Sequence, residues 1–198
     1  MVSKVLHRTH LYLALFLMPW MLMYALSTMA MNHRETFKAY YGGRLVEYRK
    51  VEEQIYTGMF AEGAGSRIVA EQILNDLDLD GTHTVRGRLD RGRITILRQD
   101  PITPKRITYT TKDRRVVVEE QIFRPPSFLE SLHRRRGYGH EYVLEDVWAF
   151  SVDLVILAMV FWAVSGIWMW WEVRSTRGLG ALCAGVGVLL FLFFVLTL

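Results

Sequence analysis

Three long apolar runs lie at the two ends of this chain, one before a polar middle section and two after it. They cover Leu11–Asn32, Val147–Trp171 and Leu179–Leu198. A helix needs about 20 residues to cross a hydrocarbon core of about 30 Å, and each run has about that length. The sequence therefore predicts three membrane-spanning helices, with everything from residue 34 to residue 146 on one side of the bilayer.

The first run also has features of a secretory signal peptide. Lys4 and Arg8 precede it, and Thr28-Met29-Ala30 resembles a cleavage site. Its apolar part is longer than the central region of an ordinary signal peptide. We therefore favour an uncleaved membrane anchor.

Charges on the short connections predict the orientation of the spans. Lys4 and Arg8 precede the first span, and Arg174 and Arg177 lie between the second and the third. Both segments must lie on the same side of the membrane, and short segments rich in Lys and Arg stay in the cytoplasm. We therefore expect the N-terminus inside, and residues 34–146 and the C-terminus outside.

The charge balance and the cysteine content exclude some classes of function. Residues 34–146 carry 20 Lys and Arg against 18 Asp and Glu, a mixed and nearly neutral set that does not fit a nucleic-acid-binding protein. Cys183 is the one cysteine of the sequence and lies in the third run. A single cysteine excludes both an intrachain disulfide and a cysteine-based metal cluster.

The middle section has the pattern of an α+β domain. Ser66 has the residue type of an N-cap, apolar residues recur after it at helical spacing as far as Leu77, and Gly81 supplies a stop. Residues 85–96 then alternate between apolar and polar around the turn Asp90-Arg91-Gly92, which is typical of a hairpin.

Further strands follow and precede this hairpin. A second pair of strands, between Ile107 and Ile122, surrounds the turn Lys112-Asp113-Arg114, and residues 44–57 predict one more strand. A helix joined to an antiparallel sheet buries one face of the sheet. We expect the arginines of the strands on the other, solvated face.

A short amphipathic helix is predicted after the sheet. Pro125-Pro126 ends the strands, and Phe128, Leu129 and Leu132 then lie at helical spacing beside Arg134–Arg136. An apolar stripe next to a basic run is typical of a helix that lies in the membrane interface. We expect it on the outer surface.

The predicted organisation has six parts, each with its own environment. They are the cytoplasmic N-terminus with the first span (1–33), the extracytoplasmic α+β domain (34–126), the interfacial helix and linker (127–146), the second span (147–171), a cytoplasmic loop (172–178) and the third span (179–198).

Several of these segments resemble PepSY-associated transmembrane proteins. His10–His33 is similar to that family's first span, in which a His opens the helix, a Pro lies mid-span and Asn-His closes it. Leu132–Trp171 is similar to the next span in its Leu-His before a Gly-aromatic pair, its Asp within the helix, and its Ser-Gly followed by a Trp pair. Ala70–Gly81 and the hairpins after it resemble a PepSY domain, which is an α+β module.

The resemblance implies a fold class and a location. The expected fold is a membrane α-helical protein with three transmembrane helices and an extracytoplasmic α+β PepSY-like domain inserted between helices 1 and 2, in the bacterial inner membrane. Two features depart from the family pattern. Ser27-Thr28 stands where Ser-Gly or Thr-Gly is expected, and the better-known relatives are larger, with more spans and more histidines.

The resemblance also implies a cofactor. Some of the larger relatives are haem-bearing reductases that pass electrons outward to iron complexes. A haem b takes two axial ligands, commonly histidines. His33, His133 and His140 lie near the outer membrane edge, so one interpretation is an outer haem held by His33 with His133 or His140. At the inner edge, His7 and His10 share one segment, which does not support a second haem within one chain. The other interpretation makes the outer histidines interfacial residues bonded to backbone or lipid.

Asp153 is the acidic residue within the second span, and its predicted partners lie on the first. Carboxylates inside a membrane are costly and normally face other helices. Tyr24 and Ser27 lie at a similar predicted depth, so a hydrogen bond from one of them to Asp153 is expected. Such a bond either locks the helix pair or forms part of a proton relay. Ser165-Gly166 marks another surface where two helices approach closely.

The sequence contains no recognised catalytic signature, and two functions are compatible with it. The first is a non-catalytic accessory protein that binds other membrane subunits, or itself, through its outer domain and lipid-facing helices. The alternative is a haem-dependent electron-transfer protein of ferric-siderophore reduction and iron uptake. Enzymatic activity is left open by the sequence, and the bilayer is the one partner that every interpretation shares.

Overall fold

The protein, seen in a computed structural model, divides into two compact units. The structure describes residues 2–61, 63–79, 81–135, 137–138 and 142–198. One unit consists of Met1–Met21 and Ser151–Leu198, and the other of Leu22–Phe150. The first boundary lies within a long helix, two residues after Pro19. A proline removes one backbone hydrogen bond from the interior of a helix.

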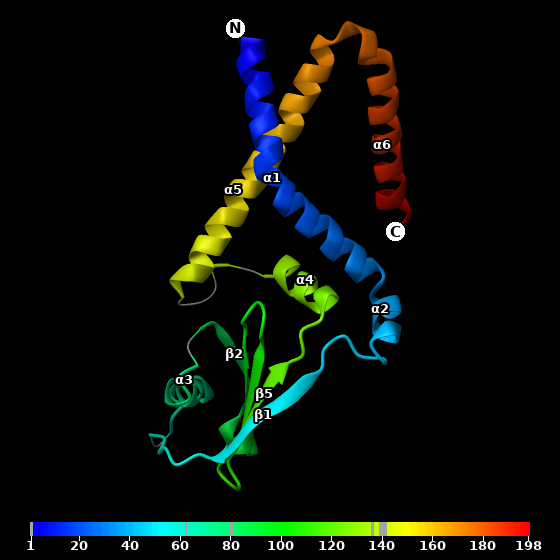
Figure 1. Cartoon of the computed structure of the whole chain (residues 1–198). Coiled ribbons are helices and arrows are strands. Elements are labelled where there is room, and N and C mark those ends of the chain that lie inside the picture. The colour runs from blue at the N-terminus through cyan, green and yellow to red at the C-terminus, as the bar shows by residue number, and fades with distance from the viewer. Residues whose placement is uncertain (1, 62, 80, 136, 139–141) are drawn as a thin grey trace. The chain divides into compact units, whose positions relative to one another are not determined.

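Three of the described helices are long and apolar enough to cross a membrane (Figure 1). They are α1 (Val2–Asn32), α5 (Val143–Glu172) and α6 (Arg177–Thr197). Helices α1 and α5 contain the first two apolar runs, and α6 covers the third as far as Thr197, so the prediction of three such helices is confirmed. Helices α1 and α5 begin before their apolar runs, because polar residues can continue the same backbone hydrogen bonding.

Helix α6 leaves α5 through a tight connection, the 3₁₀ turn η2 (Arg174–Thr176). The Trp170 indole Nε1 donates to the Thr176 carbonyl at 3.2 Å and closes this corner. A Cβ at Gly180 would lie only 1.9 Å from that nitrogen. Glycine is therefore required where α6 passes the indole.

Five antiparallel strands form one sheet in the order β1-β5-β4-β3-β2. Their bounds are β1 (Tyr48–Ile55), β2 (His83–Arg88), β3 (Arg93–Arg98), β4 (Lys105–Thr110) and β5 (Arg115–Gln121). Strands β2 to β5 form a meander, and β1 pairs with β5 at one edge. The predicted hairpin, second strand pair and additional strand are all present.

The turn between β2 and β3 depends on its glycines. It consists of the 3₁₀ turn η1 (Leu89–Arg91) and Gly92, whose φ of 79° is left-handed. Gly87 also has a left-handed φ of 87°, and a Cβ there would lie 2.6 Å from the Arg93 carbonyl oxygen. Glycine avoids both the strain and the clash.

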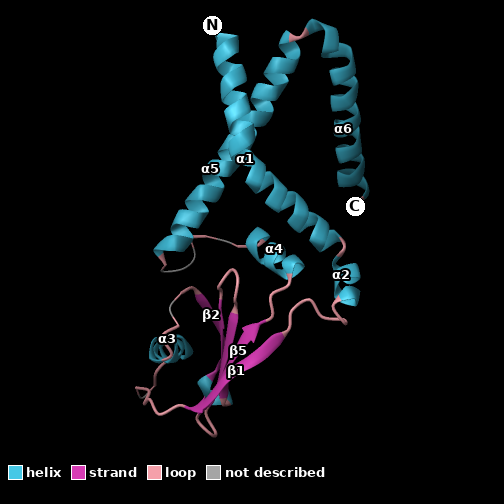
Figure 2. Cartoon of the chain, viewed as in Figure 1, coloured by secondary structure: helices cyan, strands magenta, loops and turns pink. Residues whose placement is uncertain are grey.

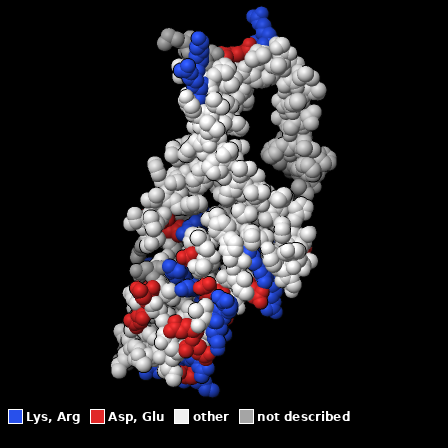
Figure 3. All heavy atoms as spheres, in the orientation of Figure 1, with Lys and Arg blue, Asp and Glu red and all other residues white. Residues whose placement is uncertain are grey.

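Helix α3 (Ser66–Asp76) packs on one face of the sheet (Figure 2). Its buried residues recur at helical spacing: Val69, Ala70, Ile73 and Leu74. They meet alternate strand residues of that face: Ile94, Ile96, Ile107, Tyr109, Val116 and Val118. Acidic and basic side chains cover much of the sheet region, whereas the long helices are largely uncharged (Figure 3).

Two short helices flank the sheet. Helix α4 (Pro125–His133) begins at the proline pair, which is favourable because proline fits the first positions of a helix. It confirms the predicted helix after the strands. Helix α2 (Arg34–Tyr40) was not predicted, since its seven residues show too little apolar periodicity.

Tyr56 gives the sheet core a pH dependence. Its hydroxyl donates to Asp76 Oδ2 at 2.5 Å, and burial together with this bond raises the pKa of Tyr56 to about 12. In the unfolded chain the pKa is about 10. The tyrosine therefore stabilises the fold fully below pH 10, and the contribution is lost as the pH rises towards 12.

Tyr56→Phe should lower the free energy of unfolding by about 1 kcal/mol at neutral pH. The variant should also lose less stability than the wild type between pH 10 and pH 12, which unfolding curves at alkaline pH measure. An unchanged alkaline profile would contradict it.

Candidate functional site

His133 lies in a polar contact with the outer part of α1. Its Nδ1 is 2.7 Å from Ser27 Oγ, and its ring meets Tyr24 edge to face with centroids 5.1 Å apart. Ser27 is fully buried. Tyr24 and Ser27 lie one helical turn apart on α1, so one face of that helix supplies both contacts.

The same hydroxyl fixes the tautomer of His133. Ser27 Oγ donates its one proton to the Tyr24 carbonyl at 2.9 Å. A carbonyl can only accept, so the contact with His133 is satisfied when Nδ1–H donates to Ser27 Oγ. This assignment, inferred from the network, leaves Nε2 of a neutral His133 with the free lone pair.

His10 has an equivalent arrangement in the other unit. Its Nδ1 lies 2.8 Å from Ser165 Oγ, and Ser165 donates to the Trp162 carbonyl at 2.9 Å. The imidazole stacks on Trp162 with ring centroids 5.2 Å apart. A Cβ at Gly166 would lie 3.4 Å from His10 Cε1, so the glycine lets the ring approach α5.

The Nε2 nitrogen of each of these two histidines can therefore serve as a metal ligand or a proton acceptor. A histidine that ligates iron or another metal commonly donates its other ring nitrogen to a neighbour, which fixes the ring and the tautomer. The same free lone pair can accept a proton. Each site supplies one such nitrogen, and the described residues contain no group of three or more side chains that could hold a metal ion.

The other predicted haem ligands are placed only in part. His33 is exposed and caps α2 without a side-chain hydrogen bond to it. Its neighbour Arg34 pairs with Glu130 of α4 at 2.5 Å, three residues before His133. His140 lies outside the described residues. The ligand set of His33 with His133 or His140 therefore stays a prediction.

The bond from Asp153 to Tyr24 or Ser27 also stays a prediction. Asp153 is exposed and belongs to the unit of Ser151–Leu198, whereas Tyr24 and Ser27 belong to the other. Within their own unit, the Ser27 hydroxyl contacts His133 and the Tyr24 carbonyl.

A buried ion pair ties the sheet to the start of α5. Glu145 is 2% exposed, accepts from Thr82 Oγ1 at 3.0 Å and from Arg135 Nε at 3.1 Å, and also pairs with Arg135 Nη2. Gly137 lies against the same helix, and a Cβ on it would be 2.0 Å from Ala149 Cβ. Arg135 and Gly137, which follow α4, therefore pack closely against the start of α5.

Arg124 is a second buried charged residue of this unit, and its contacts join two segments of the chain. It is 8% exposed, donates to the Arg44 carbonyl and pairs with Glu47. Its guanidinium also lies over the Tyr41 ring, 4.8 Å from the centroid. The segment between α2 and β1 is thereby fixed to the residue that precedes α4.

The partners of His10 were missed by sequence reasoning. Ser165-Gly166 was interpreted only as a place of close helix approach. A hydroxyl beside a glycine, facing a histidine on another span, carries a signal for a polar contact as well, since Ser often hydrogen-bonds between membrane helices.

Long apolar helices together with a separate antiparallel sheet define the class as a membrane protein with a folded polar portion. The chain belongs to the PepSY_TM-like family, whose profile matches residues 1–198, the whole sequence. This match confirms the resemblance drawn from the sequence. No curated protein and no solved structure matches the chain significantly.

Proposed function

We propose that this protein is a membrane-anchored PepSY-type accessory protein, a small subunit of a larger complex in the bacterial inner membrane. The exposure of α6 is the observation that carries the proposal. No residue of α6 is buried against the described part of the chain. A helix whose side chains are exposed in this way is available to helices of other subunits.

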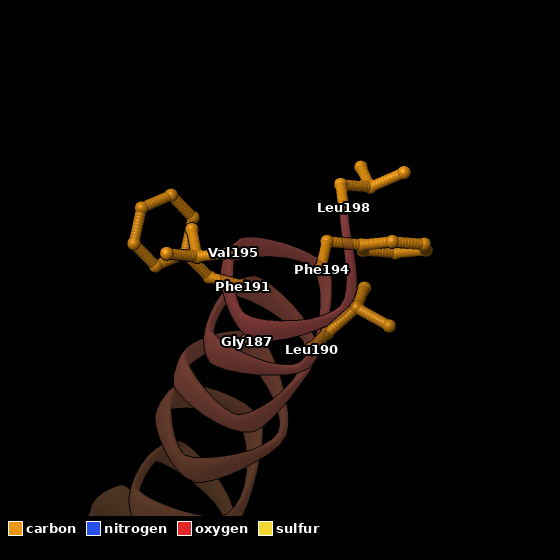
Figure 4. Close-up of a pocket in the computed structure, with 6 residues that line it drawn as sticks. All are labelled: Gly187, Leu190, Phe191, Phe194, Val195 and Leu198. Atoms are coloured by element: carbon orange, nitrogen blue, oxygen red, sulfur yellow. The ribbon is translucent and has the colours of Figure 1, made fainter.

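The outer half of α6 has a shape suited to a second helix. Its side chains border a shallow hollow between aromatic rings (Figure 4), lined by Gly187, Leu190, Phe191, Phe194, Val195 and Leu198. Lipid tails are as apolar as these residues, so helices associate in a membrane through interlocking shape. A hollow beside a glycine offers such a shape.

The proposed arrangement places the sheet outside the cytoplasm. Lys4, Arg8, Arg174 and Arg177 favour cytoplasmic ends for the helices that they flank. The sheet and α3, which occupy the sequence between α1 and α5, then form the extracytoplasmic PepSY-like domain, and α4 lies at the outer surface. From there the domain can bind the extracytoplasmic part of a partner.

Site-specific photocrosslinking in native membranes tests the accessory role. A photoreactive amino acid at Phe191, in the hollow, should yield a discrete protein adduct. Leu189 is a matched control, because it is 68% exposed on the same helix and points about 160° away at 100° per residue. Lipid-only products at both positions would contradict the proposal.

Electron transfer through haem is a second candidate function, and the contacts of His133 favour it. The described residues fit one axial position, because Ser27 orients the ring and Nε2 carries the lone pair. His33 or His140 would supply the second nitrogen. Haem, when bound, supplies one-electron transfer, as ferric-siderophore reduction requires.

Absorption spectra of the purified chain test this second function. Protein supplied with haem should show a Soret band that His133→Ala abolishes, because one axial ligand is lost. Ser27→Ala should weaken haem retention about tenfold, since the ring loses its orienting partner. His83→Ala is the control, because His83 lies on β2 and contacts the Gly81 carbonyl at 3.3 Å. A colourless protein, or a Soret band that His133→Ala leaves intact, would contradict the assignment.

A further inference from the structure

The sheet has a second face that α3 does not cover. Residues alternate along a strand, so the positions between the core residues point away from α3. We call these the open sheet face: Thr84, Arg86, Arg93, Thr95, Arg106, Thr108, Arg115, Val117 and Glu119. Pairing of Arg86 with Thr95, Thr95 with Thr108 and Thr108 with Val117 places them in one surface.

Thr108 lies at the centre of this face and carries an unsatisfied hydroxyl. It is on the middle strand β4 and only 6% exposed. Its Oγ1 is buried with no hydrogen-bond partner in the described part of the chain. A buried hydroxyl without a partner destabilises a fold, and valine would fill the same space without that cost. The Thr108 hydroxyl can therefore donate to a ligand that reaches it.

The open sheet face also carries positive charge that its own carboxylates do not neutralise. Arg106 forms a two-pronged pair with Glu119, at 2.6 and 2.8 Å, and Arg115 pairs with Glu53 at 2.5 Å. Arg86 and Arg93 are exposed and form no ion pair or hydrogen bond with any residue that the structure describes; the charge of Arg93 acts at longer range on Glu119 and, after the effect of Arg106, helps to lower the pKa of that carboxyl. Two guanidinium groups are therefore available to an anion.

Charges on distant strands act together on this face. Burial raises the pKa of Tyr48, and the positive charges of Arg106 and Arg86 oppose that rise. Tyr48 begins β1 and Arg86 lies on β2, the two opposite edges of the sheet. The Arg106 guanidinium lies over the Tyr48 ring at 4.1 Å. The Arg106 side chain therefore extends from the middle strand across β5 to the β1 edge of this face.

We propose that the open sheet face binds a phosphate group, with Arg86 and Arg93 pairing its charge and the Thr108 hydroxyl donating to one of its oxygens. Two unpaired cations match the charge of a phosphomonoester, which approaches −2 at neutral pH. Guanidinium groups bind phosphate oxygens with directed hydrogen bonds. The long arginine side chains are exposed and can rearrange to admit the group.

The phosphate can come from a soluble phosphomonoester or from a lipid headgroup, and the two sources separate experimentally. The full chain in detergent is titrated with glycerol 3-phosphate, and the chain in nanodiscs is compared with and without phosphatidic acid. Binding of glycerol 3-phosphate identifies a soluble ligand, and binding of phosphatidic acid alone identifies a lipid. Absence of binding in both arms overturns the proposal.

Three variants distinguish phosphate binding at this site from non-specific attraction of the phosphate by positive charge. Arg86→Gln and Thr108→Val should each weaken binding by about tenfold or somewhat less, the loss of one good hydrogen bond to a charged group. Arg49→Gln removes one charge from the other face of β1 and should leave affinity within about twofold, as expected for a screened, exposed charge.

Thr108→Val also reports on folding. It should unfold at the same temperature as the wild type or a higher one, because an unsatisfied hydroxyl is removed. Lost binding with retained stability supports the site. Unchanged binding in Thr108→Val, or an equal loss in Arg49→Gln, overturns it.

Discussion

Glu145→Gln should destabilise the unit of Leu22–Phe150 by about 3 kcal/mol, the cost of leaving one partner of a buried ion pair without its counter-charge. Glu145 is the least exposed charged residue described, and its carboxylate meets both Arg135 and Thr82. Glutamine keeps the shape but offers Arg135 only one neutral acceptor. Pulse proteolysis of the detergent-solubilised chain across a urea series gives the free energy of unfolding.

Asp146→Asn is the matched control for that change. Asp146 follows Glu145 in the first turn of α5 and is exposed. Its replacement also removes one negative charge from the helix N-terminus, so it should cost about 0.5 kcal/mol. Equal losses in the two variants would show that charge at the helix end, rather than the buried pair, stabilises this junction.

Ile73→Ala should cost about 3 kcal/mol of sheet stability, the usual range for a buried large-to-small change. Ile73 is fully buried on α3 and belongs to the core cluster against the strands. Removing its side chain leaves a cavity that strands paired on both sides cannot close. The same proteolysis assay measures the loss.

Ile68→Ala on the same helix separates packing from helix propensity. Ile68 is 59% exposed, so its replacement should change stability by no more than about 0.5 kcal/mol. Similar losses at both positions would contradict the orientation of α3 on the sheet.

Periodicity accounted for most of the fold. The apolar runs predicted the long helices because length and composition decide that question directly. Alternation around Asp90-Arg91-Gly92 predicted β2 and β3, since the turn residues and the pattern agree. Helix α2 was not predicted, because seven residues are too few to show helical apolar periodicity. A helix of this length is also not stable by itself and depends on tertiary contacts.

The polar contacts were harder to predict, because they join residues far apart in sequence. Glu145 looked like an ordinary acidic residue near a helix start, and nothing local showed that Thr82 and Arg135 meet it. Ser27 contacts His133, which lies far along the sequence, and no local pattern indicated that contact; the bond from Ser27 or Tyr24 to Asp153 stays a prediction. Depth limits which residues can meet, but it does not choose among several polar groups at one level.

The position of Thr108 shows the same limit. Threonine is common in strands, so the sequence alone did not single out Thr108. Its lack of a hydrogen-bond partner emerges only when the side chains around it are placed. The arginine stripe was visible in the sequence, but its division into paired and unpaired members was not.

Cysteine labelling in spheroplasts tests the proposed topology most directly. Cys183 is first replaced by Ser, and a single cysteine is placed at Lys112, in the exposed turn between β4 and β5, or at Ser175, in η2. With residues 34–146 outside, a membrane-impermeant maleimide should modify the Lys112→Cys protein in intact spheroplasts and the Ser175→Cys protein only after permeabilisation. The reverse pattern would contradict an N-terminus inside and an extracytoplasmic sheet.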